Sequence, residues 1–246
     1  MIIGSDIQFY KMLTSTNTQA LSLLKTKGIP EGTVICADFQ TAGKGQGGNI
    51  WESDIGRNLL ISIILYPESV SPAEQFLISM TIALGIIDFT EKYYHGSSIK
   101  WPNDIYIKNG KIAGILIENS IMGENIESTV AGIGLNINQE MFAGHILNPV
   151  SLRLITGREY DRVICLKQLL TDLDVRYKQL LYGDRETLTS EYIARLYRFK
   201  EWCTYRSGDI IFTGRILNVT SSGRLQIGKK KGKVMEFSFK EIDFIL

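Results

Sequence analysis

Lys100 is a charged residue at the end of an apolar run, next to a tryptophan and a proline. Pro102 disfavours helical backbone at Trp101, so Lys100 and Trp101 are expected in extended chain, with side chains on opposite faces. Since Trp101 is large and apolar, we predict that Trp101 packs and that Lys100 faces a polar cavity. An ammonium held there would act electrostatically, because the ordinary pKa of lysine, about 10.4, keeps it charged at neutral pH. A strand-end lysine in water is the alternative that residue types leave open.

The glycine-rich segment of residues 40–49 is a second candidate, with four glycines among residues 43–48. Such a backbone can approach a ligand closely and offer N–H groups to phosphate. A Walker loop is excluded because Lys44 is followed by Gly45 and not by Ser or Thr. A dinucleotide fingerprint is excluded because residues 58–66 predict a strand and not a helix. The pattern predicts a mobile loop over a site on a sheet, with a flexible surface turn as the alternative.

A third candidate lies at residues 15–17, where Ser, Thr and Asn stand in sequence. Residues 16–19 have capping-box spacing and predict a helix to about Lys27, with Gly28 as its stop. Free N–H groups and hydroxyls at such a helix start can hold a hydrogen-bonding ligand. Simple capping explains the same residues.

The intervening segments predict the elements that carry these residues. Strands are predicted at residues 33–38, 58–66 and 128–138, and a hairpin at residues 105–108 and 111–118, turning at Asn109-Gly110. Helices are predicted from the capping box at residues 71–74 to about Tyr94, at 162–182 and at 186–198. Gly132, Gly134 and Asn136 fall on one strand face, where something can approach the backbone. Residues 142–156 read as loop.

The C-terminal part differs in character. Short alternating strands are predicted at residues 210–219, 224–227, 233–239 and 242–245. This pattern is typical of a small SH3-type β-barrel. We therefore expect two domains, residues 1–198 and residues 199–246. The run Lys229-Lys230-Lys231 is interpreted as a solvated hairpin tip.

Composition limits the classes of partner. The net charge of +1 does not indicate the excess of basic residues that binding to nucleic acid or to an anionic membrane usually requires. Three cysteines without metal-ligand spacing and two histidines argue against structural zinc and a disulfide framework. No basic signal-peptide region or membrane-length apolar run is visible. We expect a reducing, cytoplasmic compartment, with no DNA and no membrane partner.

Five motifs in order resemble those of the biotin protein ligases, also called biotin–[biotin carboxyl-carrier protein] ligases. They are Ser15-Thr16-Asn17, Gln40-Thr41-Ala42-Gly43-Lys44-Gly45 with Trp51-Glu52-Ser53 behind it, Lys100-Trp101-Pro102-Asn103-Asp104, Gly110-Lys111-Ile112-Ala113-Gly114-Ile115-Leu116-Ile117-Glu118, and Gly132-Ile133-Gly134-Leu135-Asn136. The match covers nearly the whole chain. It implies an α+β fold: a mixed β-sheet with flanking helices, like the class II synthetase-type catalytic domain of these ligases, plus a small C-terminal SH3-like β-barrel.

The resemblance implies a reaction in two steps. Biotin and ATP give biotinyl-5′-AMP and pyrophosphate, and a lysine of a biotin carboxyl carrier domain then takes the biotin while AMP leaves. Lys100 is expected to be the catalytic lysine that offsets the charge growing at the α-phosphorus, and Mg²⁺, with ligands that the sequence leaves unknown, to neutralise the phosphates. A closed loop would keep water from the mixed anhydride.

The resemblance also assigns binding residues. Ser15, Thr16, Asn17 and Gln40 would hold the biotin ureido ring, backbone at Gly43, Lys44, Gly45 and Gln46 would close over biotin and the adenylate, and Gly114, Ile115 and Leu116 would line the biotin tail. Lys44, Gln46, Asn49, Trp51, Asn103, Asn136 and Lys240 are the expected nucleotide neighbours.

Two departures from the family pattern carry expectations of their own. Arginines of the family's glycine loop are replaced here by Lys44, Gln46 and Asn49. A charged hydrogen bond to phosphate contributes roughly 1.5–3 kcal/mol, so Gln46 predicts weaker retention of biotinyl-AMP, by about tenfold or more. The second departure is the absence of the N-terminal helix-turn-helix of bifunctional relatives, which leads us to expect a ligase and not a repressor.

Two alternatives stay open. A lipoate-type ligase would share the fold and chemistry, although its Arg-Arg and Gly-Gly-Gly loop is missing. A non-catalytic module that binds biotin or the carrier is the other. A homodimer is possible, and the sequence does not say which carboxylase supplies the carrier.

Overall fold

A seven-stranded mixed sheet forms the centre of the molecule in the computed structural model, which describes residues 1–26, 28–230 and 232–245. Only its first pair of strands is parallel, and the other neighbours are antiparallel. In spatial order the strands are β1 (Ile7–Tyr10), β2 (Val34–Ala37), β3 (Leu59–Leu65), β7 (Asn125–Leu135), β6 (Gly110–Met122), β5 (Asp104–Ile107) and β4 (Ser97–Lys100).

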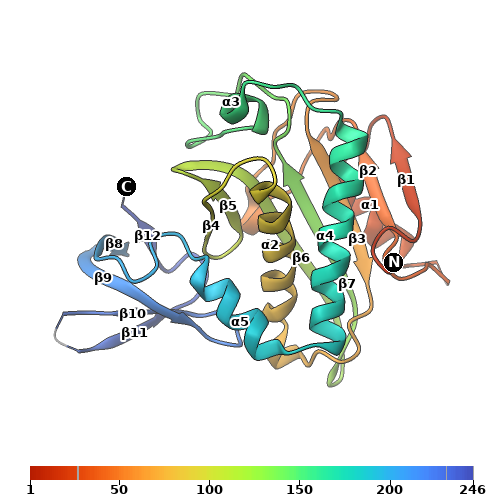
Figure 1. Cartoon of the computed structure of the whole chain (residues 1–246). Helices are drawn as coiled ribbons and strands as arrows, with labels where there is room; N and C mark the ends of the chain where they lie inside the picture. Colours follow the sequence, from red (N-terminus) through yellow and green to blue (C-terminus); the bar gives the residue numbers. More distant parts are fainter. Residues whose placement is uncertain (27, 231, 246) are drawn as a thin grey trace.

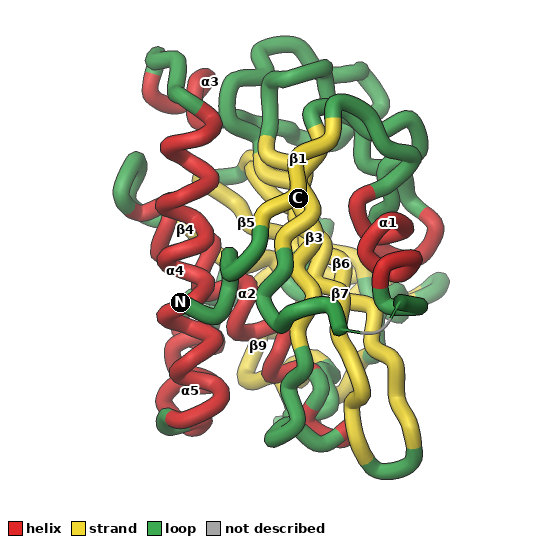
Figure 2. The backbone as a smooth tube through the Cα atoms, turned by 90° about the vertical axis from the view of Figure 1, so that its right-hand side faces the viewer, coloured by secondary structure: helices red, strands yellow, loops and turns green. Residues whose placement is uncertain are grey.

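Helices cover both faces of this sheet (Figures 1 and 2). One face carries α2 (Phe76–Glu91), α4 (Arg162–Tyr182) and α5 (Arg185–Ala194), and the other carries the short helix α1 (Thr16–Leu23). All seven residues of β3 are buried, because a strand covered on both faces has no solvent side. The small helix α3 (Leu152–Thr156) lies beyond the end of the sheet, together with the loop that precedes it.

The apolar core has a large and a small part. The large part lies between the sheet and α2, α4 and α5, and it includes Phe89, Leu173 and Tyr177. On the opposite face, Ala20 of α1 packs near Ile35 and Ile64 in a much smaller cluster. Because α1 is short and its first turn is polar, this face keeps room for a cavity beside the small core.

A second sheet of five strands follows at the C-terminal end, in the order β11 (Val234–Phe237), β10 (Leu225–Gly228), β9 (Ile210–Val219), β8 (Cys203–Ser207) and β12 (Asp243–Phe244). It packs against the first sheet through aromatic side chains. The Trp101 indole N–H donates a hydrogen bond of 3.0 Å to the Gly223 carbonyl, and the Phe239 ring centroid lies 5.4 Å from that of Trp101. The expected fold class, a mixed sheet with flanking helices plus a small C-terminal β-domain, is therefore confirmed, while the division at residue 198 stays a prediction.

Several expected elements differ from the structure in detail. The hairpin forms, but Ile107 pairs with Gly110, so Lys108 and Asn109 make the turn in place of Asn109-Gly110. Lys108 takes the positive φ of 55° that the turn requires. The helix start expected at Ser71 is a 3₁₀ turn, Pro72–Glu74, and α2 begins after it.

The short elements β1, α3 and β8 were not predicted, because each has five residues or fewer and shows no clear periodicity. The first helix, predicted to continue to about Lys27, ends earlier, at Leu23. Lys27 itself and the third residue of the lysine run, Lys231, lie outside the described residues. Among the helices that the structure describes, none is long and apolar enough to cross a membrane.

Candidate functional site

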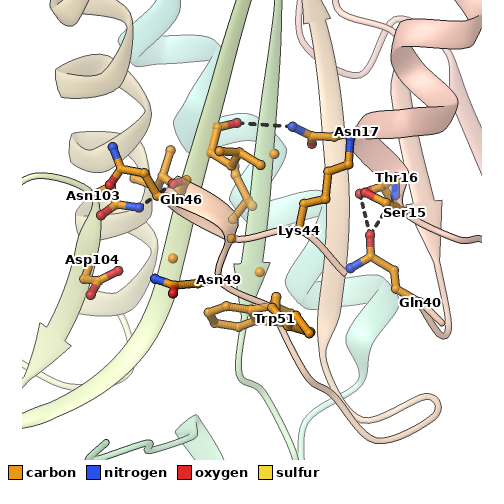
Figure 3. A pocket seen from close by; sticks show the side chains of 18 of the residues that line it. Ser15, Thr16, Asn17, Gln40, Lys44, Gln46, Asn49, Trp51, Asn103 and Asp104 are labelled. Carbon is orange, nitrogen blue, oxygen red and sulfur yellow. Dashed lines mark hydrogen bonds between the residues drawn. The ribbon is translucent and has the colours of Figure 1, made fainter. Parts of the chain in front are cut away.

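A cavity of about 190 Å³ lies on the α1 side of the sheet, under the glycine-rich loop (Figure 3). Most of the residues that the sequence assigns to ligand binding line it. From the sequence assignment these are Ser15, Thr16, Asn17, Gln40, Lys44, Gly45, Gln46, Asn49, Trp51, Asn103, Gly114, Ile115, Leu116 and Lys240. Three assigned residues, Lys100, Gly43 and Asn136, are not among the lining residues.

The start of α1 forms one end of the cavity as a network of hydroxyl and amide groups, in which Asn17 Nδ2 donates a hydrogen bond of 2.7 Å to the Glu118 carboxylate. Gln40 Oε1 accepts hydrogen bonds from Thr16 N at 2.7 Å and from Thr16 Oγ1 at 3.0 Å (Figure 3). Ser62 Oγ lies 2.8 Å from Thr16 Oγ1 and 2.5 Å from Asn17 Oδ1. Neither Ser15 nor Thr16 caps the helix with its side chain, so capping does not explain these residues. Their donors and acceptors are held rigidly at the cavity wall.

Strand β7 provides the floor beneath this network, because it has glycine where a side chain would fill the cavity. A Cβ atom on Gly132 would lie 2.1 Å from Asn17 Oδ1, and a Cβ atom on Gly134 would lie 2.3 Å from Cε2 of Trp51. The prediction that these glycines allow something to approach the backbone is confirmed, and the groups that approach are the side chains of Asn17 and Trp51.

The glycine loop forms the cover. Gly45 N donates to the Asn49 carbonyl at 2.7 Å, and Trp51 N donates to the Gly43 carbonyl at 3.0 Å, so the loop closes on itself. A short 3₁₀ turn, Gln46–Gly48, forms its tip, where Gly47 has a φ of 64°. Trp51 then enters the sheet face and lies over Gly114 and Gly134 of the adjacent strands β6 and β7.

Lys111 is the lysine of the hairpin that lines the cavity, and sequence reasoning missed its role. Its ammonium lies 2.6 Å from Asp104 Oδ1 and 5.6 Å from the ring centroid of Trp51. The pairing of β5 with β6 shifts here, since Tyr106 faces Lys111 whereas Ile105 faces Ala113. The extra residue, Ile112, forms a β-bulge, which re-aims side chains and puts Lys111 on the same side as Gly114. The motif around Gly110 includes Lys111. Regular alternation along the strand would place Lys111 on the same face as Ala113, which is buried, so the sequence did not indicate that Lys111 lines the cavity.

The prediction that Lys100 faces the polar cavity is wrong. Its ammonium donates a hydrogen bond of 3.2 Å to Tyr106 Oη and lies 5.5 Å from the ring centroid of Phe244, in the second sheet. Burial lowers the pKa of Lys100 below the ordinary lysine value. The alternation argument correctly put Trp101 in the core, where it is 3% exposed, but the face opposite Trp101 is not the cavity.

Two buried polar atoms near the Trp51 end have no hydrogen-bond partner among the described residues: Nε1 of Trp51 and Oδ1 of Asn136. The Asn136 side chain is held by a hydrogen bond of 3.0 Å, which its Nδ2 donates to the Val150 carbonyl. Buried groups of this kind normally have a partner, so an orphaned donor and an orphaned acceptor indicate a place where a ligand supplies the partners. Asn136 lies two residues beyond Gly134, which Trp51 covers.

Three cations reach the cavity from separate segments, namely Lys44, Lys111 and Lys240, and among its described lining residues Asp104 is the one carboxylate. The site therefore combines a hydrogen-bonding set of hydroxyl and amide groups at α1 with three lysine side chains in the same lining. This arrangement suits a ligand with a polar uncharged head and an anionic partner. The described residues contain no group of three or more His, Cys, Asp or Glu side chains that could hold a metal ion.

The chain is similar in sequence to known proteins. Residues 9–136 match the model of the biotin/lipoate A/B protein ligase family. The biotin–[acetyl-CoA-carboxylase] ligase of Paracoccus denitrificans is 30% identical over 228 residues, which cover 89% of this chain and 92% of that protein. The bifunctional ligase/repressor BirA of Bacillus subtilis is 31% identical over 186 residues, and the chain covers 56% of its length.

The fold matches as well. The biotin protein ligase from Aquifex aeolicus in complex with biotin and ATP superimposes with a TM-score of 0.79 and 25% identity, covering 97% of this chain and 98% of that one. The family match spans the residues that build the cavity floor and cover, and the structural match spans both sheets. The chain therefore belongs to the biotin/lipoate A/B protein ligase family.

Proposed function

We propose that this protein is an ATP-dependent biotin–[biotin carboxyl-carrier protein] ligase. It would activate biotin as biotinyl-5′-AMP and transfer the biotinyl group to a lysine of a carrier domain. The observation that carries this proposal is one cavity that combines hydroxyl and amide groups at α1 with three lysines, under the glycine loop. Biotin has an uncharged ureido head and a carboxylate tail, and the second substrate is a polyanion.

The set of hydroxyl and amide groups at α1 is assigned to the ureido ring. That ring offers one carbonyl acceptor and two N–H donors, so it needs both kinds of partner. Ser15, Thr16, Asn17 and Gln40 supply hydroxyl and amide groups that the Ser62 network holds in place. Gly114, Ile115 and Leu116, on β6, are assigned to the biotin tail.

We assign the charge-offsetting role to Lys111 and no longer to Lys100. In the first step, the biotin carboxylate attacks the α-phosphorus of ATP, a P–O bond forms, and pyrophosphate leaves. Lys111 lies in the cavity, where its ammonium can approach both anions, and Asp104 fixes its position. A preorganised cation in a cavity stabilises the charge that grows at phosphorus. Lys100 has no such access, since its contacts are Tyr106 and Phe244.

The adenylate is assigned to the other end of the cavity. Lys44, Gln46 and Asn49 of the loop, with Lys240, line the cavity and are assigned to the phosphates. Trp51 Nε1 is a free donor of the cavity lining that suits an adenine base, whereas Asn136 Oδ1 is a free acceptor outside that lining. Asn103 contacts the adjacent strand β6, because its Nδ2 donates a hydrogen bond of 2.7 Å to the Ile115 carbonyl. Backbone at Gly43 and Gly45 would close over the intermediate.

Mg²⁺ remains part of the proposal, as a partner of the phosphates. Asp104 is the one carboxylate in the described lining, and it is already paired with Lys111. The side chains present therefore do not build a magnesium site of their own. Magnesium commonly keeps water and phosphate ligands, with few from protein, and no step here depends on its position.

In the second step, the amine of the carrier lysine attacks the carbonyl carbon of the mixed anhydride, an amide bond forms, and AMP leaves with the bonding electron pair. Exclusion of water by the loop would preserve the anhydride until then. A biotin carboxyl carrier domain is the proposed protein partner. The cytoplasm is the proposed compartment, in keeping with three cysteines that form no disulfide. The absence of DNA binding and a possible homodimer stay predictions.

The test is ATP–pyrophosphate exchange with biotin and, separately, with lipoate, followed by mass spectrometry of a carrier domain incubated with protein, biotin and ATP. We expect exchange with biotin alone and a carrier heavier by one biotinyl group. Exchange with lipoate in place of biotin would favour the lipoate-type alternative. No exchange with either acid, combined with measurable biotin binding, would favour the non-catalytic module.

A further inference from the structure

Lys240 connects the C-terminal part of the molecule to the cover of the cavity. It follows β11, and its ammonium donates a hydrogen bond of 2.6 Å to the carbonyl oxygen of Gly47, at the tip of the glycine loop. The two residues are separated by 193 positions in the chain. Lys240 and its neighbour Phe239 also line the cavity.

The local backbone is built around this contact. A Cβ atom on Gly47 would lie 2.1 Å from Cε and 2.3 Å from Nζ of Lys240, so the loop has no side chain where the lysine crosses it. Lys240 itself has a φ of 67°, in the left-handed region that favours glycine. Lys240 thus has a long cationic side chain at a position where the backbone conformation favours glycine.

The base of Lys240 is fixed on both sides. Phe239 packs against Trp101, and its ring centroid lies 6.0 Å from that of Phe76. Ser238 N donates a hydrogen bond of 2.7 Å to Glu241 Oε2, and this bond closes the turn that carries Lys240. The lysine therefore extends from a rigid base toward the loop.

The charge of Lys240 is available to a ligand. Among the described residues, no carboxylate lies within ion-pair distance of its ammonium, and the Gly47 carbonyl uses one of its three N–H donors. In the loop itself, Gln46 and Asn49 are uncharged, and Lys44 is the one cation. Lys240 brings a second positive charge to the same place from another sheet.

We propose that Lys240 is a positioning residue that holds the glycine loop closed over biotinyl-AMP and supplies the positive charge that Gln46 does not. Retention of the intermediate then depends on the docking of the C-terminal sheet. This inference rests on the proposed function, because the anion that it retains is the adenylate.

Lys240→Gly tests the inference without straining the backbone, since glycine suits the φ of this position. We expect release of preformed biotinyl-AMP to accelerate about three- to tenfold, as loss of one exposed charged hydrogen bond implies. We also expect KM for ATP to rise while kcat for pyrophosphate exchange changes less than twofold. The thermal midpoint should stay within about 2 °C of wild type. Glycine removes the strain of a positive φ at this position, and this gain offsets the larger conformational entropy that glycine gives the unfolded chain.

Three further variants separate positioning from a general structural effect. Lys240→Arg should restore most of the retention, because it keeps both the donor and the charge. Gly47→Ala should accelerate release less than Lys240→Gly, because it disturbs the loop contact but keeps the Lys240 charge. The double variant should be no faster than Lys240→Gly alone, since the loop contact is already lost there. Gln46→Arg in the Lys240→Gly background should slow release again.

Lys233→Met is the matched control, an exposed lysine of the same sheet that does not line the cavity, and its release rate should equal that of wild type. Release within twofold of wild type in Lys240→Gly, or additive effects in the double variant, would overturn the inference. The proposed function would survive that result, because it fails only if the wild-type protein forms no biotinyl-AMP.

Discussion

Two lysines of neighbouring strands show how strongly local geometry decides what a residue can do. Lys100 and Lys111 are both close to Asp104 in the strand register, but only Lys111 forms the ion pair and lines the cavity. Lys100 is enclosed by Tyr106 and Phe244, so it links the first sheet to the second. The same charge therefore lines the cavity at one position and contributes to packing at the other.

Lys111→Met and Lys100→Met form a matched pair that tests this assignment. Removing the Lys111 ammonium should reduce biotinyl-AMP synthesis by about a hundredfold or more, because the growing charge at phosphorus loses its partner. Lys100→Met should keep synthesis within about fivefold of wild type, since it removes a contact outside the cavity. Pyrophosphate exchange measures both, and circular dichroism checks folding. A larger loss in Lys100→Met than in Lys111→Met would return the role to Lys100.

Asp174 of α4 predicts how stability depends on pH. Burial raises the pKa of Asp174, but hydrogen bonds from Lys178 and from the N–H groups of Ile2 and Ile3 outweigh burial and hold the pKa below the ordinary 3.8. The unfolded chain thus binds the proton more readily, so this contribution to stability is present above pH 3.8 and is lost as pH falls through the lowered pKa.

Asp174→Asn should therefore lower the free energy of unfolding by about 2 kcal/mol at pH 7, and the difference from wild type should shrink below pH 4. Urea denaturation at pH 7, 5 and 3 measures it. Asp209→Asn, at an exposed position, is the control and should change stability by less than about 0.5 kcal/mol. A difference that stays constant down to pH 3 would refute the role of the Asp174 charge.

At the scale of elements, β7 determines the shape of the cavity with two glycines on one face. Gly132 leaves room for Asn17, which Glu118 holds through a 2.7 Å hydrogen bond from Asn17 Nδ2, and Gly134 leaves room for Trp51. Neither neighbour can move without losing contacts. One strand thus positions Asn17 and Trp51 separately, which the proposed function assigns to biotin and to the nucleotide.

Gly132→Ala and Gly134→Ala should therefore affect different substrates. A methyl group at Gly132 should raise KM for biotin about tenfold or more by displacing Asn17, with a smaller effect on ATP. At Gly134 it should raise KM for ATP by a similar factor by displacing Trp51, because a contact of 2.3 Å forces the indole away. Steady-state pyrophosphate exchange with each substrate varied in turn is the measurement, and equal effects on both substrates would contradict the division.

At the scale of the whole molecule, the two sheets meet through a small aromatic interface that also supports the site. Trp101 donates to Gly223, Phe239 packs on Trp101, and Phe76 lies against Gly223, where a Cβ atom would come within 2.7 Å of the ring. Since Lys240 follows Phe239 directly, this interface positions the contact with the glycine loop.

Trp101→Phe should keep the ring packing but remove the indole N–H, leaving the buried Gly223 carbonyl without its donor. We expect a loss of about 1–2 kcal/mol in the free energy of unfolding, measured by urea denaturation. Trp202→Phe is the control, because Trp202 is 43% exposed and its N–H has no hydrogen-bond partner among the described residues. A loss in Trp101→Phe no larger than in this control would mean that the hydrogen bond contributes nothing.

The sequence by itself determined the periodic elements and the composition of the site. The bounds predicted for α4 and β9 agree with the structure, because long amphipathic or alternating segments carry their own signal. The neutral residues at α1, the glycine loop and the face of β7 were assigned correctly to one cavity, since motifs in a shared order restrict what can lie together.

Only the tertiary structure decided which lysine lines the cavity and which residue contacts the tip of the glycine loop. The β-bulge at Ile112 reverses the alternation that otherwise groups Lys111 with the core, and a bulge depends on pairing between strands, which no local pattern records. The Lys240–Gly47 contact joins residues far apart in the chain, and its geometry follows from how the second sheet packs on the first. Interactions of this kind depend on the folded arrangement of both sheets, so residue types and spacing alone could not reveal them.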